Sequence, residues 1–377
     1  MRSVYSNVTE MYNMIALCKR TRSSKFQDRH DSELWTIEPS IWAIIGYTVV
    51  IPVVSALGII GNSLILAVHL KTKTYLKAST YTYLVVLASS DLITCLLILF
   101  SSLARGIFRC QKGWLEFDAF VHFPIGSVSS NITVWAALGV SIDRLITVCM
   151  RRSKPPRFCR PQVARKLMIF ATLFAILFNI PYCFMYKYDE HGDLTTTTFF
   201  HSRWYNIQNW FQFIIFGLIP SVFLLIANAV MLYSVKKVLK QREMLLRRKN
   251  IREGNRLRDQ ARLTIMLVGI VFLFLVGELP THLVSRRSAV SLLYGGDPFK
   301  VRESLMASLR AWATFLNALA SSTNFILYCI LSPCFYVRLK RMLLPERILN
   351  RRKAKRGPTA YFHREPEGRE KCEIFVL

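Results

Sequence analysis

The chain has 377 residues, of which 52% are apolar, and its 50 Lys and Arg against 23 Asp and Glu give a formal net charge of +27. Its mean hydropathy is nevertheless positive, at +0.30. A nucleic-acid-binding protein of this charge would be polar throughout, and a disordered chain would lack the apolar residues. The charges must therefore be separated from long apolar runs, as in a protein that crosses a membrane several times. This balance also argues against an ordinary soluble enzyme.

Seven segments are long and apolar enough to cross a bilayer, because about 20 apolar residues span its hydrocarbon core. They lie at residues 40–69, 79–104, 119–149, 165–187, 208–235, 262–285 and 306–332. They must be helices, since every backbone polar group inside a bilayer needs a partner within the segment. The sequence therefore predicts an all-α membrane protein with a seven-helix bundle over residues 40–332, preceded by a tail at 1–39 and followed by a basic tail at 346–377.

A short amphipathic helix is predicted over residues 333–345, directly after the seventh segment. In CFYVRLKRMLL the apolar residues Phe335, Leu339 and Met342 recur at helical spacing, with basic residues between them. A helix of this kind lies on the membrane surface. Cys334 at its start is a candidate for palmitoylation, which would add a lipid anchor.

Lys and Arg gather after the first, third and fifth segments and in the tail after the seventh. The positive-inside rule places these stretches in the cytoplasm and the N-terminus outside. The glycosylation sequon at Asn7 agrees, since it is usable only outside, whereas a second sequon at Asn131 lies inside the third segment and should stay unmodified. We therefore expect a multi-pass plasma-membrane protein whose basic stretches contact anionic lipid, without a nucleic-acid partner.

Two acids lie deep inside the apolar segments, where an ionisable residue costs about 2.5–3.5 kcal/mol at the bilayer centre. Asp91, in the middle of the second segment, is either a protonated buried acid or a carboxylate that coordinates a cation. Glu278, near the outer end of the sixth, precedes a predicted kink at Pro280 and either faces an outer cavity or makes a structural hydrogen bond. The candidate sodium site comprises Asp91, Thr133, Ser321 and Asn324. No other cofactor and no other metal is expected.

Short motifs follow one another along the seven segments. They are Gly61-Asn62 in the first, L-A-S-S-D ending at Asp91 in the second, Asp143-Arg144-Leu145 in the third, Pro220 in the fifth, Phe274 and Pro280 in the sixth, and N-F-I-L-Y at residues 324–328 in the seventh. In this order they resemble the motifs of the rhodopsin-like (class A) G-protein-coupled receptors. The resemblance implies a receptor, not an enzyme, which binds a ligand from outside and a heterotrimeric G protein inside.

Two departures from the usual motifs narrow the resemblance. Phe325 stands where the family usually has Pro, and Glu278 where it usually has Trp. Together with FNIPYCF and SSTNFILYC, they resemble invertebrate myosuppressin and FMRFamide-like neuropeptide receptors. That implies an amidated peptide ligand ending in Arg-Phe-amide or similar. The alternative is a divergent seven-span chemosensory receptor for a small molecule.

The resemblance also implies an outer cavity lined by the third, fifth, sixth and seventh segments. The candidate ligand-binding residues are His122, Ser129, Trp210, Phe213, Glu278, His282, Trp312 and Phe315. A carboxylate is needed for the peptide's guanidinium, and Glu278 is the first candidate, with Asp189, Glu190 and Asp193 as the alternative. The resemblance assigns the activation switch to Asp143, Arg144, Phe274, Pro280, Asn324 and Tyr328. The short, basic third inner loop suits a G-protein helix.

One expected cysteine is missing. The family usually has a cysteine at the outer end of the third segment, bonded to the second outer loop, but that place falls near Ala119. Cys110 could instead pair with Cys183 or with Cys18, because connectivity cannot be deduced from spacing.

Overall fold

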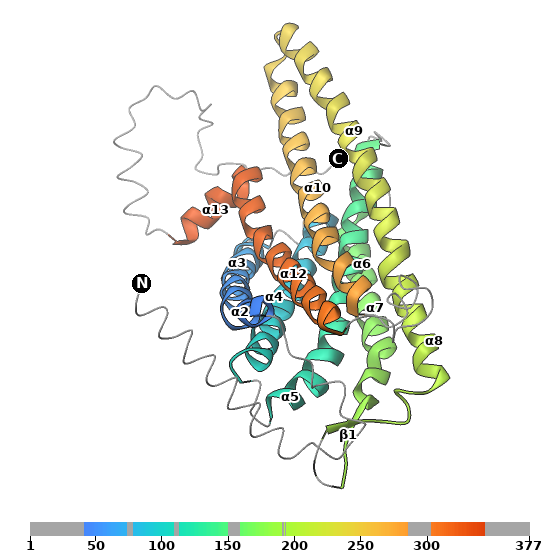
Figure 1. Ribbon diagram of the computed structural model, residues 1–377. Coiled ribbons are helices and arrows are strands. Elements are labelled where there is room, and N and C mark those ends of the chain that lie inside the picture. Colours follow the sequence, from blue (N-terminus) through green and yellow to red (C-terminus); the bar gives the residue numbers. More distant parts are fainter. Residues whose placement is uncertain are drawn as a thin grey trace, which may run out of the picture.

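The computed structural model describes residues 41–73, 78–108, 113–149, 159–190, 192, 194–285 and 303–343. Within these ranges seven helical segments are long and apolar enough to cross a membrane. Their main helices are α3 (Ile51–Lys71), α4 (Ser79–Arg105), α6 (Phe123–Cys149), α7 (Pro161–Asn179), α9 (Ile219–Arg247), α10 (Ile251–Ser285) and α12 (Glu303–Leu331). The predicted fold class, an all-helical seven-span bundle, is confirmed (Figure 1).

Shorter elements continue four of these helices at one end of the bundle. They are α2 (Ile41–Ile45) and the π-turn η1 (Gly46–Val50) before α3, α5 (Trp114–Phe117) and the π-turn η3 (Asp118–His122) before α6, the 3₁₀ turn η5 (Ile180–Phe184) after α7, and α8 (Arg203–Phe211) with the π-turn η6 (Gln212–Leu218) before α9. Strands β1 (Tyr186–Tyr188) and β2 (Leu194–Thr196) form an antiparallel hairpin there. We call this the hairpin end, and the opposite end, where α9 and α10 join, the basic end.

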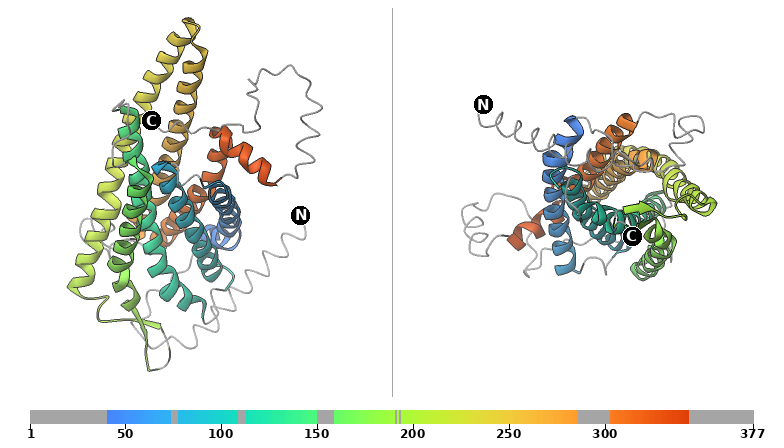
Figure 2. Two further views of the ribbon diagram at one scale, coloured as in Figure 1. Left: turned by 180° about the vertical axis from the view of Figure 1, so that it is seen from behind. Right: turned by 60° about the horizontal axis from the view of Figure 1, so that its bottom comes forward.

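Packing closes the helices into one bundle. α3 packs against α4, α4 against α6, α9 against α10 and α10 against α12, and α12 returns to α3 (Figure 2). The largest buried apolar cluster joins α3, α4, α6, α7, α10, α12 and α13; Tyr83, Leu84 and Leu267 at its centre are fully buried. This cluster fixes the relative rotation of the helices and hence the direction of their polar side chains.

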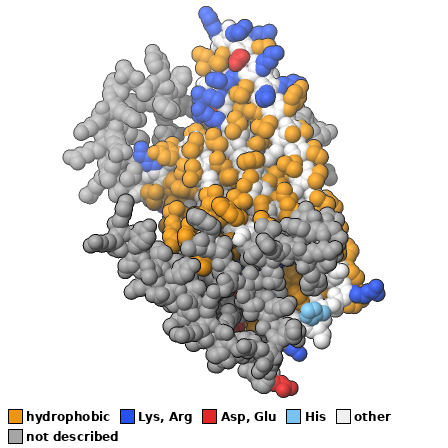
Figure 3. Space-filling model, viewed as in Figure 1, with side chains coloured by type: hydrophobic (Ala, Val, Ile, Leu, Met, Phe, Trp, Pro, Cys, Tyr) orange, Lys and Arg blue, Asp and Glu red, His pale blue; other side chains and the backbone are white. Residues whose placement is uncertain are grey.

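The burial pattern is the reverse of that of a water-soluble protein. On α7, Ile169, Phe170 and Leu177 are each more than 60% exposed, whereas Asp91 and Asn131 are 3% and 0% exposed inside the bundle. An apolar outer surface is stable against lipid, and polar groups are stable where other helices bond them. Apolar side chains cover the middle of the molecule, and Lys and Arg gather where α9 and α10 meet (Figure 3).

α9 and α10 extend well past the rest of the bundle (Figure 1). The sequence predicted membrane segments that end at 235 and begin at 262, yet α9 continues to Arg247 and α10 begins at Ile251. Hydropathy marks only the membrane-embedded part, while the Leu, Lys, Arg, Glu and Gln of the extension are good helix formers. The turn uses a left-handed Lys249 (φ 59°), and the Asn250 side chain accepts a bond of 3.3 Å from the Glu253 amide, which caps α10.

The amphipathic helix after the seventh span is also present, as α13 (Pro333–Leu343). Its residues Phe335 and Leu339 are buried against the bundle, whereas Tyr336 and Leu343 are more than half exposed. α13 leaves the bundle sideways, as a helix on a membrane surface must (Figure 2).

The hairpin end of α6 is held without the cysteine that the resemblance implied. Ala119 is buried in a cluster with Tyr182, Met185, Tyr186 and Tyr205, which ties η3 to η5, β1 and α8. Burial and the neighbouring Tyr205 raise the pKa of Tyr186 well above its usual value, so this phenol stays neutral. Aromatic packing therefore fixes the hairpin against η3.

An ion pair holds the other side of η3. Asp118, 1% exposed, accepts bonds from Arg105 of α4 at 2.7 and 3.2 Å and from the Ser101 hydroxyl. Arg105 also donates to the Tyr47 hydroxyl at 3.4 Å and lies 5.7 Å from the centre of its ring. These contacts connect η3 with α4 and η1.

Candidate functional site

A small cavity lies at mid-depth in the bundle. It has a volume of about 10 Å³ and is lined by Leu87, Asp91, Thr133, Ile270, Phe274, Gly277, Glu278, Asn317, Ala320, Ser321 and Asn324. A volume of this order holds about one water molecule. Both intramembrane acids that the sequence singled out therefore face the same enclosed space.

Asp91 is bonded mainly from α12. Its carboxylate accepts from the Asn324 amide at 2.7 Å and from the Ser321 hydroxyl at 3.4 Å. Asn62 of α3 joins the group by donating to the Ser321 carbonyl at 3.1 Å. The predicted sodium-site residues Asp91, Ser321 and Asn324 are thus brought together, and Thr133 lines the same cavity. Carboxylate, hydroxyl and amide oxygens are the ligands that suit a hard cation.

Three consecutive residues of α6 point toward three different neighbours. Ser129 donates to the Ser90 carbonyl of α4 at 2.9 Å. Ser130 donates to Glu278 of α10 at 2.7 Å. Asn131 and Gln212 of η6 exchange amide hydrogen bonds of 2.7 and 3.4 Å, and both side chains are fully buried. The middle of α6 is therefore the polar junction of the bundle.

Glu278 belongs to this junction. It is 5% exposed and accepts hydrogen bonds from Ser130 on α6 and, at 3.2 Å, from Asn317 on α12. His282, one turn along α10, places its Nε2 3.7 Å from the Glu278 carboxylate and is 3% exposed. Glu278 and His282 are thus close together, as parts of an interior network that joins three helices.

The other predicted ligand-binding residues are dispersed. Phe213 is buried and contacts the partly exposed Trp210 edge to face at 6.4 Å between ring centres. Ser129 is bonded to α4, and His122 lies beside Asp118 at the hairpin end.

The two α12 aromatics among the predicted ligand-binding residues, Trp312 and Phe315, have different surroundings. Trp312 is 62% exposed on the outside of the bundle, where an aromatic ring lies against lipid or the membrane interface. Phe315 packs against the cluster that contains Ala43, Tyr47 and Ile98, so it faces the first and second spans. The sequence could not fix the rotation of α12, and Asn317 is the α12 residue beside Glu278.

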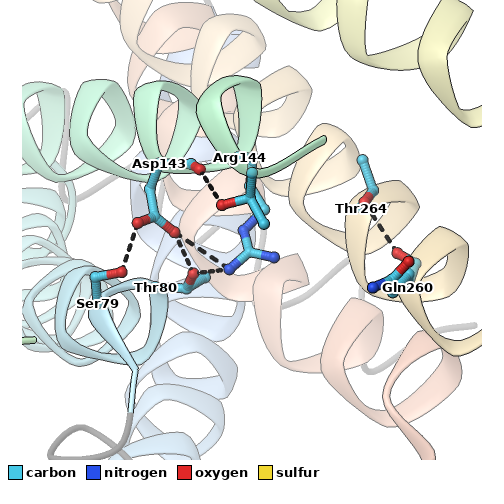
Figure 4. A network of polar contacts seen from close by, with 7 residues as sticks. Ser79, Thr80, Asp143, Arg144, Gln260 and Thr264 are labelled. Carbon is cyan, nitrogen blue, oxygen red and sulfur yellow. Dashed lines mark hydrogen bonds and ion pairs between the residues drawn. The ribbon is translucent and has the colours of Figure 1, made fainter. Parts of the chain in front are cut away.

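The Asp143–Arg144 pair lies near the basic end of α6 (Figure 4). Asp143 is 1% exposed and accepts bonds of 2.5 Å from both Ser79 and Thr80 of α4. Arg144 Nη2 lies 3.2 Å from the Asp143 carboxylate and also contacts the Thr80 hydroxyl. Burial and the Asp143 charge raise the pKa of the Cys159 thiol to about 11, so this thiol stays protonated and bonds to Asp143.

The structure places the remaining predicted switch residues on α10 and α12. Tyr328 is 2% exposed, and its ring centre lies 5.1 Å from that of Phe335 and 5.7 Å from that of His69. Phe274 lines the cavity, and α10 continues through Pro280 without interruption.

Several predictions concern residues outside or at the border of the described part of the chain. Asn7, Cys18, Cys110 and Asp193 lie outside it, as do the tails at 1–39 and 346–377. Cys183 is exposed and has no disulfide partner among the described residues, and Cys334 is partly buried at the start of α13. The disulfide, glycosylation and palmitoylation therefore stay predictions.

Comparison with known proteins decides the family. Residues 61–352 match the 7 transmembrane receptor (rhodopsin family) model. The chain belongs to this family. It is thus a multi-pass membrane receptor and not an enzyme, and the residues predicted for the activation switch lie within the matched region.

The relatives compared here share less than a quarter of their aligned residues with this chain. The chain is 22% identical to the Sex peptide receptor-related protein 2 of Caenorhabditis elegans over 63% of this chain and 56% of the relative. It is 24% identical to the Drosophila melanogaster Sex peptide receptor over 57% of this chain and 52% of the relative. It is also 24% identical to the FMRFamide receptor of the same fly, over 78% of this chain and 52% of that receptor. These matches thus span about half the length of each relative.

A solved structure supports the fold. Squid rhodopsin superimposes with a TM-score of 0.61, at 16% identity, over 86% of this chain and 95% of the rhodopsin chain. At this identity the likeness concerns the fold alone.

The sequence analysis did not select Ser130 and Asn317, which both donate hydrogen bonds to Glu278. Both are polar residues inside apolar segments, which is the available signal. Polarity alone could not show that Ser130 and Asn317, and not Ser129 and Trp312, lie beside Glu278, because the rotation of each helix depends on packing.

Proposed function

We propose that this receptor lies in the plasma membrane with its N-terminus outside, responds to an amidated FMRFamide- or myosuppressin-like neuropeptide, and signals through a heterotrimeric G protein. The observation that carries the proposal is the similarity to receptors named for peptides, the sex peptide receptor and the FMRFamide receptor of the fly. It is supported by motif departures of the kind that resemble neuropeptide receptors, Phe325 and Glu278.

The orientation rests on charge. Lys236, Lys240, Arg247 and Lys249 are exposed on the extension at the basic end, where they suit the cytoplasmic side and its anionic lipid. The extension would receive the G protein, and palmitate on Cys334 would hold α13 to the same leaflet. The hairpin end would then face the ligand, with Asn7 glycosylated on the same side.

The partner of the peptide's guanidinium is better sought at the hairpin end than at Glu278. The cavity beside Glu278 has a volume of about 10 Å³, and its carboxylate is already bonded by Ser130 and Asn317. Glu190, in the turn between β1 and β2, is exposed. An exposed carboxylate can accept paired bonds from a guanidinium without opening the bundle.

A sodium ion is proposed as an allosteric ligand of the cavity. Asp91, Thr133, Ser321 and Asn324 would hold it through oxygen atoms. A cation there would neutralise the buried Asp91 carboxylate, and the bound ion would favour whichever conformation keeps these four residues together.

The test is G-protein activation in cells that display the tagged receptor, against a panel of amidated peptides ending in Arg-Phe, with surface expression measured in parallel. We expect submicromolar activation, and a potency loss of about tenfold or more in Glu190→Gln, because a charge-assisted bond is lost. Peptides with norleucine in place of Arg should act equally on both forms. Silence of a receptor that reaches the surface would exclude this ligand class and favour a small-molecule chemosensory ligand.

A further inference from the structure

The extension of α9 and α10 at the basic end carries a large positive charge. Residues 236–262, which cover the end of α9, the turn and the start of α10, contain 11 Lys and Arg against 3 Asp and Glu, a net charge of +8. From residue 235, where the predicted membrane segment ends, α9 rises about 18 Å to Arg247. The headgroup layer is about 5–7 Å thick, and the Debye length is about 8 Å at physiological ionic strength. Anionic lipid therefore accounts for the charges nearest the membrane but not for those at the far end of the extension.

Large apolar side chains are exposed at this far end, residues 244–252, which we call the extension tip. Met244 of α9 is 52% exposed, Leu246 is 37% exposed and Ile251 of α10 is 62% exposed. The exposed residues Arg248 and Arg252 lie next to them in the chain, and apolar and basic side chains are mixed where α9 and α10 meet (Figure 3). Lipid covers such side chains on the membrane-embedded helices, whereas at the tip their contact with water costs free energy that a partner would recover.

Hydrogen bonds hold the extension tip in one conformation. The Arg248 amide donates to the Met244 carbonyl at 3.2 Å, and the Lys249 amide donates to the Leu246 carbonyl at 3.0 Å. The two helices are in close contact beside the turn, because a Cβ added at Gly254 would lie 3.0 Å from the Leu246 side chain. A surface that is already ordered loses little conformational entropy when a partner binds.

The direction of the extension limits the kind of partner. A basic amphipathic helix suits either a membrane surface or the apolar groove of a helix-binding protein. α13 leaves the bundle sideways and suits the membrane surface, whereas α9 and α10 continue along the bundle and away from it (Figures 1 and 2). Calcium-loaded sensor proteins of the calmodulin type are rich in carboxylates and open Met-rich apolar grooves that adapt to different anchors. Their chemistry is complementary to exposed apolar side chains among arginines.

We propose that the extension tip is a docking site for an acidic, calcium-loaded sensor protein of the calmodulin type. The grooves of its two lobes take Met244 and Ile251, and the acidic rims of these grooves meet Arg248 and Arg252. Because both anchors are already more than half exposed, docking leaves the packing of α9 against α10 intact.

A bound sensor would also exclude the G protein, which the proposed function assigns to the same end. Receptor signalling would then fall when cytoplasmic calcium rises. This second step rests on the proposed function, whereas the docking itself does not.

The test measures binding of purified, fluorescently labelled calmodulin to the full-length receptor in nanodiscs of neutral lipid, without peptide or G protein. Fluorescence anisotropy in the presence of calcium should give a dissociation constant of about 1 μM or tighter. Removal of calcium with EGTA should weaken binding by about tenfold or more, because the grooves close.

Variants separate the anchors from general charge attraction. Met244→Gln with Ile251→Gln should weaken calcium-dependent binding by about tenfold or more, because both apolar anchors are lost while the charge is kept. Arg248→Gln with Arg252→Gln should also weaken binding and should reduce its dependence on salt. Leu343→Gln on α13 is the matched control, because Leu343 is 58% exposed on another basic helix, and this variant should bind as wild type does.

No binding in calcium by receptor that is monodisperse would overturn the proposal. Equal affinity in calcium and in EGTA would also overturn it, as would wild-type affinity in Met244→Gln with Ile251→Gln. Exclusion of the G protein is measured separately, as a loss of receptor-catalysed nucleotide exchange when calcium-loaded calmodulin is added. Calcium-dependent binding that needs both anchors, in a receptor that catalyses no exchange with any peptide, would support the docking site and contradict the proposed function, so the two failures are distinguishable.

Discussion

Polar side chains one position apart on a buried helix take different roles because each residue is turned by about 100° from the last. Ser129, Ser130 and Asn131 contact α4, α10 and η6 in turn. The sequence could predict that polar residues matter here, and the family resemblance indicated Asp91 and Asn324, which do bond each other. It could not indicate which neighbour each side chain would face, so Ser130 was missed while Ser129 was selected.

Asp91→Asn tests the sodium proposal at the residue scale. In wild-type receptor purified in detergent, replacing potassium by sodium at constant ionic strength should raise the apparent melting temperature, because an ion bound only by the folded state stabilises it. The variant should lose this shift, since an amide cannot neutralise a cation. Asp189→Asn, outside the cavity, should keep it. Equal apparent melting temperatures of the wild-type receptor in sodium and in potassium would contradict the proposal.

At the scale of elements, the hairpin end shows how packing replaces a missing bond. Ala119 is surrounded by tyrosines of η5, β1 and α8, and the adjacent Asp118 is paired with Arg105 of α4. Sequence reasoning correctly noted the absent cysteine but could not predict what stands in its place, because the aromatic residues come from segments far apart in the chain. The length of α9 and α10 was underestimated for a different reason, since their polar ends carry no membrane signal.

Arg105→Gln should destabilise the receptor through this end. Asp118 would remain buried without its cation, and breaking such a pair costs about 3 kcal/mol. We expect the apparent melting temperature in detergent to fall by several degrees, while Arg105→Lys, which keeps the charge, should lose less. A melting temperature in Arg105→Gln equal to that of wild type would show that the pair does not hold η3.

At the scale of the whole molecule, hydropathy was sufficient to predict the seven-span architecture. The seven apolar runs correspond to the seven spans, because a segment in lipid must be long, apolar and internally hydrogen-bonded. The helical spacing of apolar residues in CFYVRLKRMLL correctly predicted α13. The relative rotation of the helices, and with it the partners of Gln212, Glu278 and Asp91, depends on packing that no single segment encodes. Glu278 and Asp91 face one small cavity between the hairpin end, to which the proposed function assigns the ligand, and the basic end, to which it assigns the G protein.

The most direct test of the central claim uses the purified full-length receptor in lipid vesicles with purified heterotrimeric G proteins. Guanine-nucleotide exchange is measured with and without amidated Arg-Phe peptides. We expect peptide-dependent exchange that saturates below micromolar concentration for at least one G-protein class. No exchange above the level of empty vesicles, with receptor that is monodisperse and unfolds cooperatively, would contradict the claim that this chain is a peptide-activated receptor.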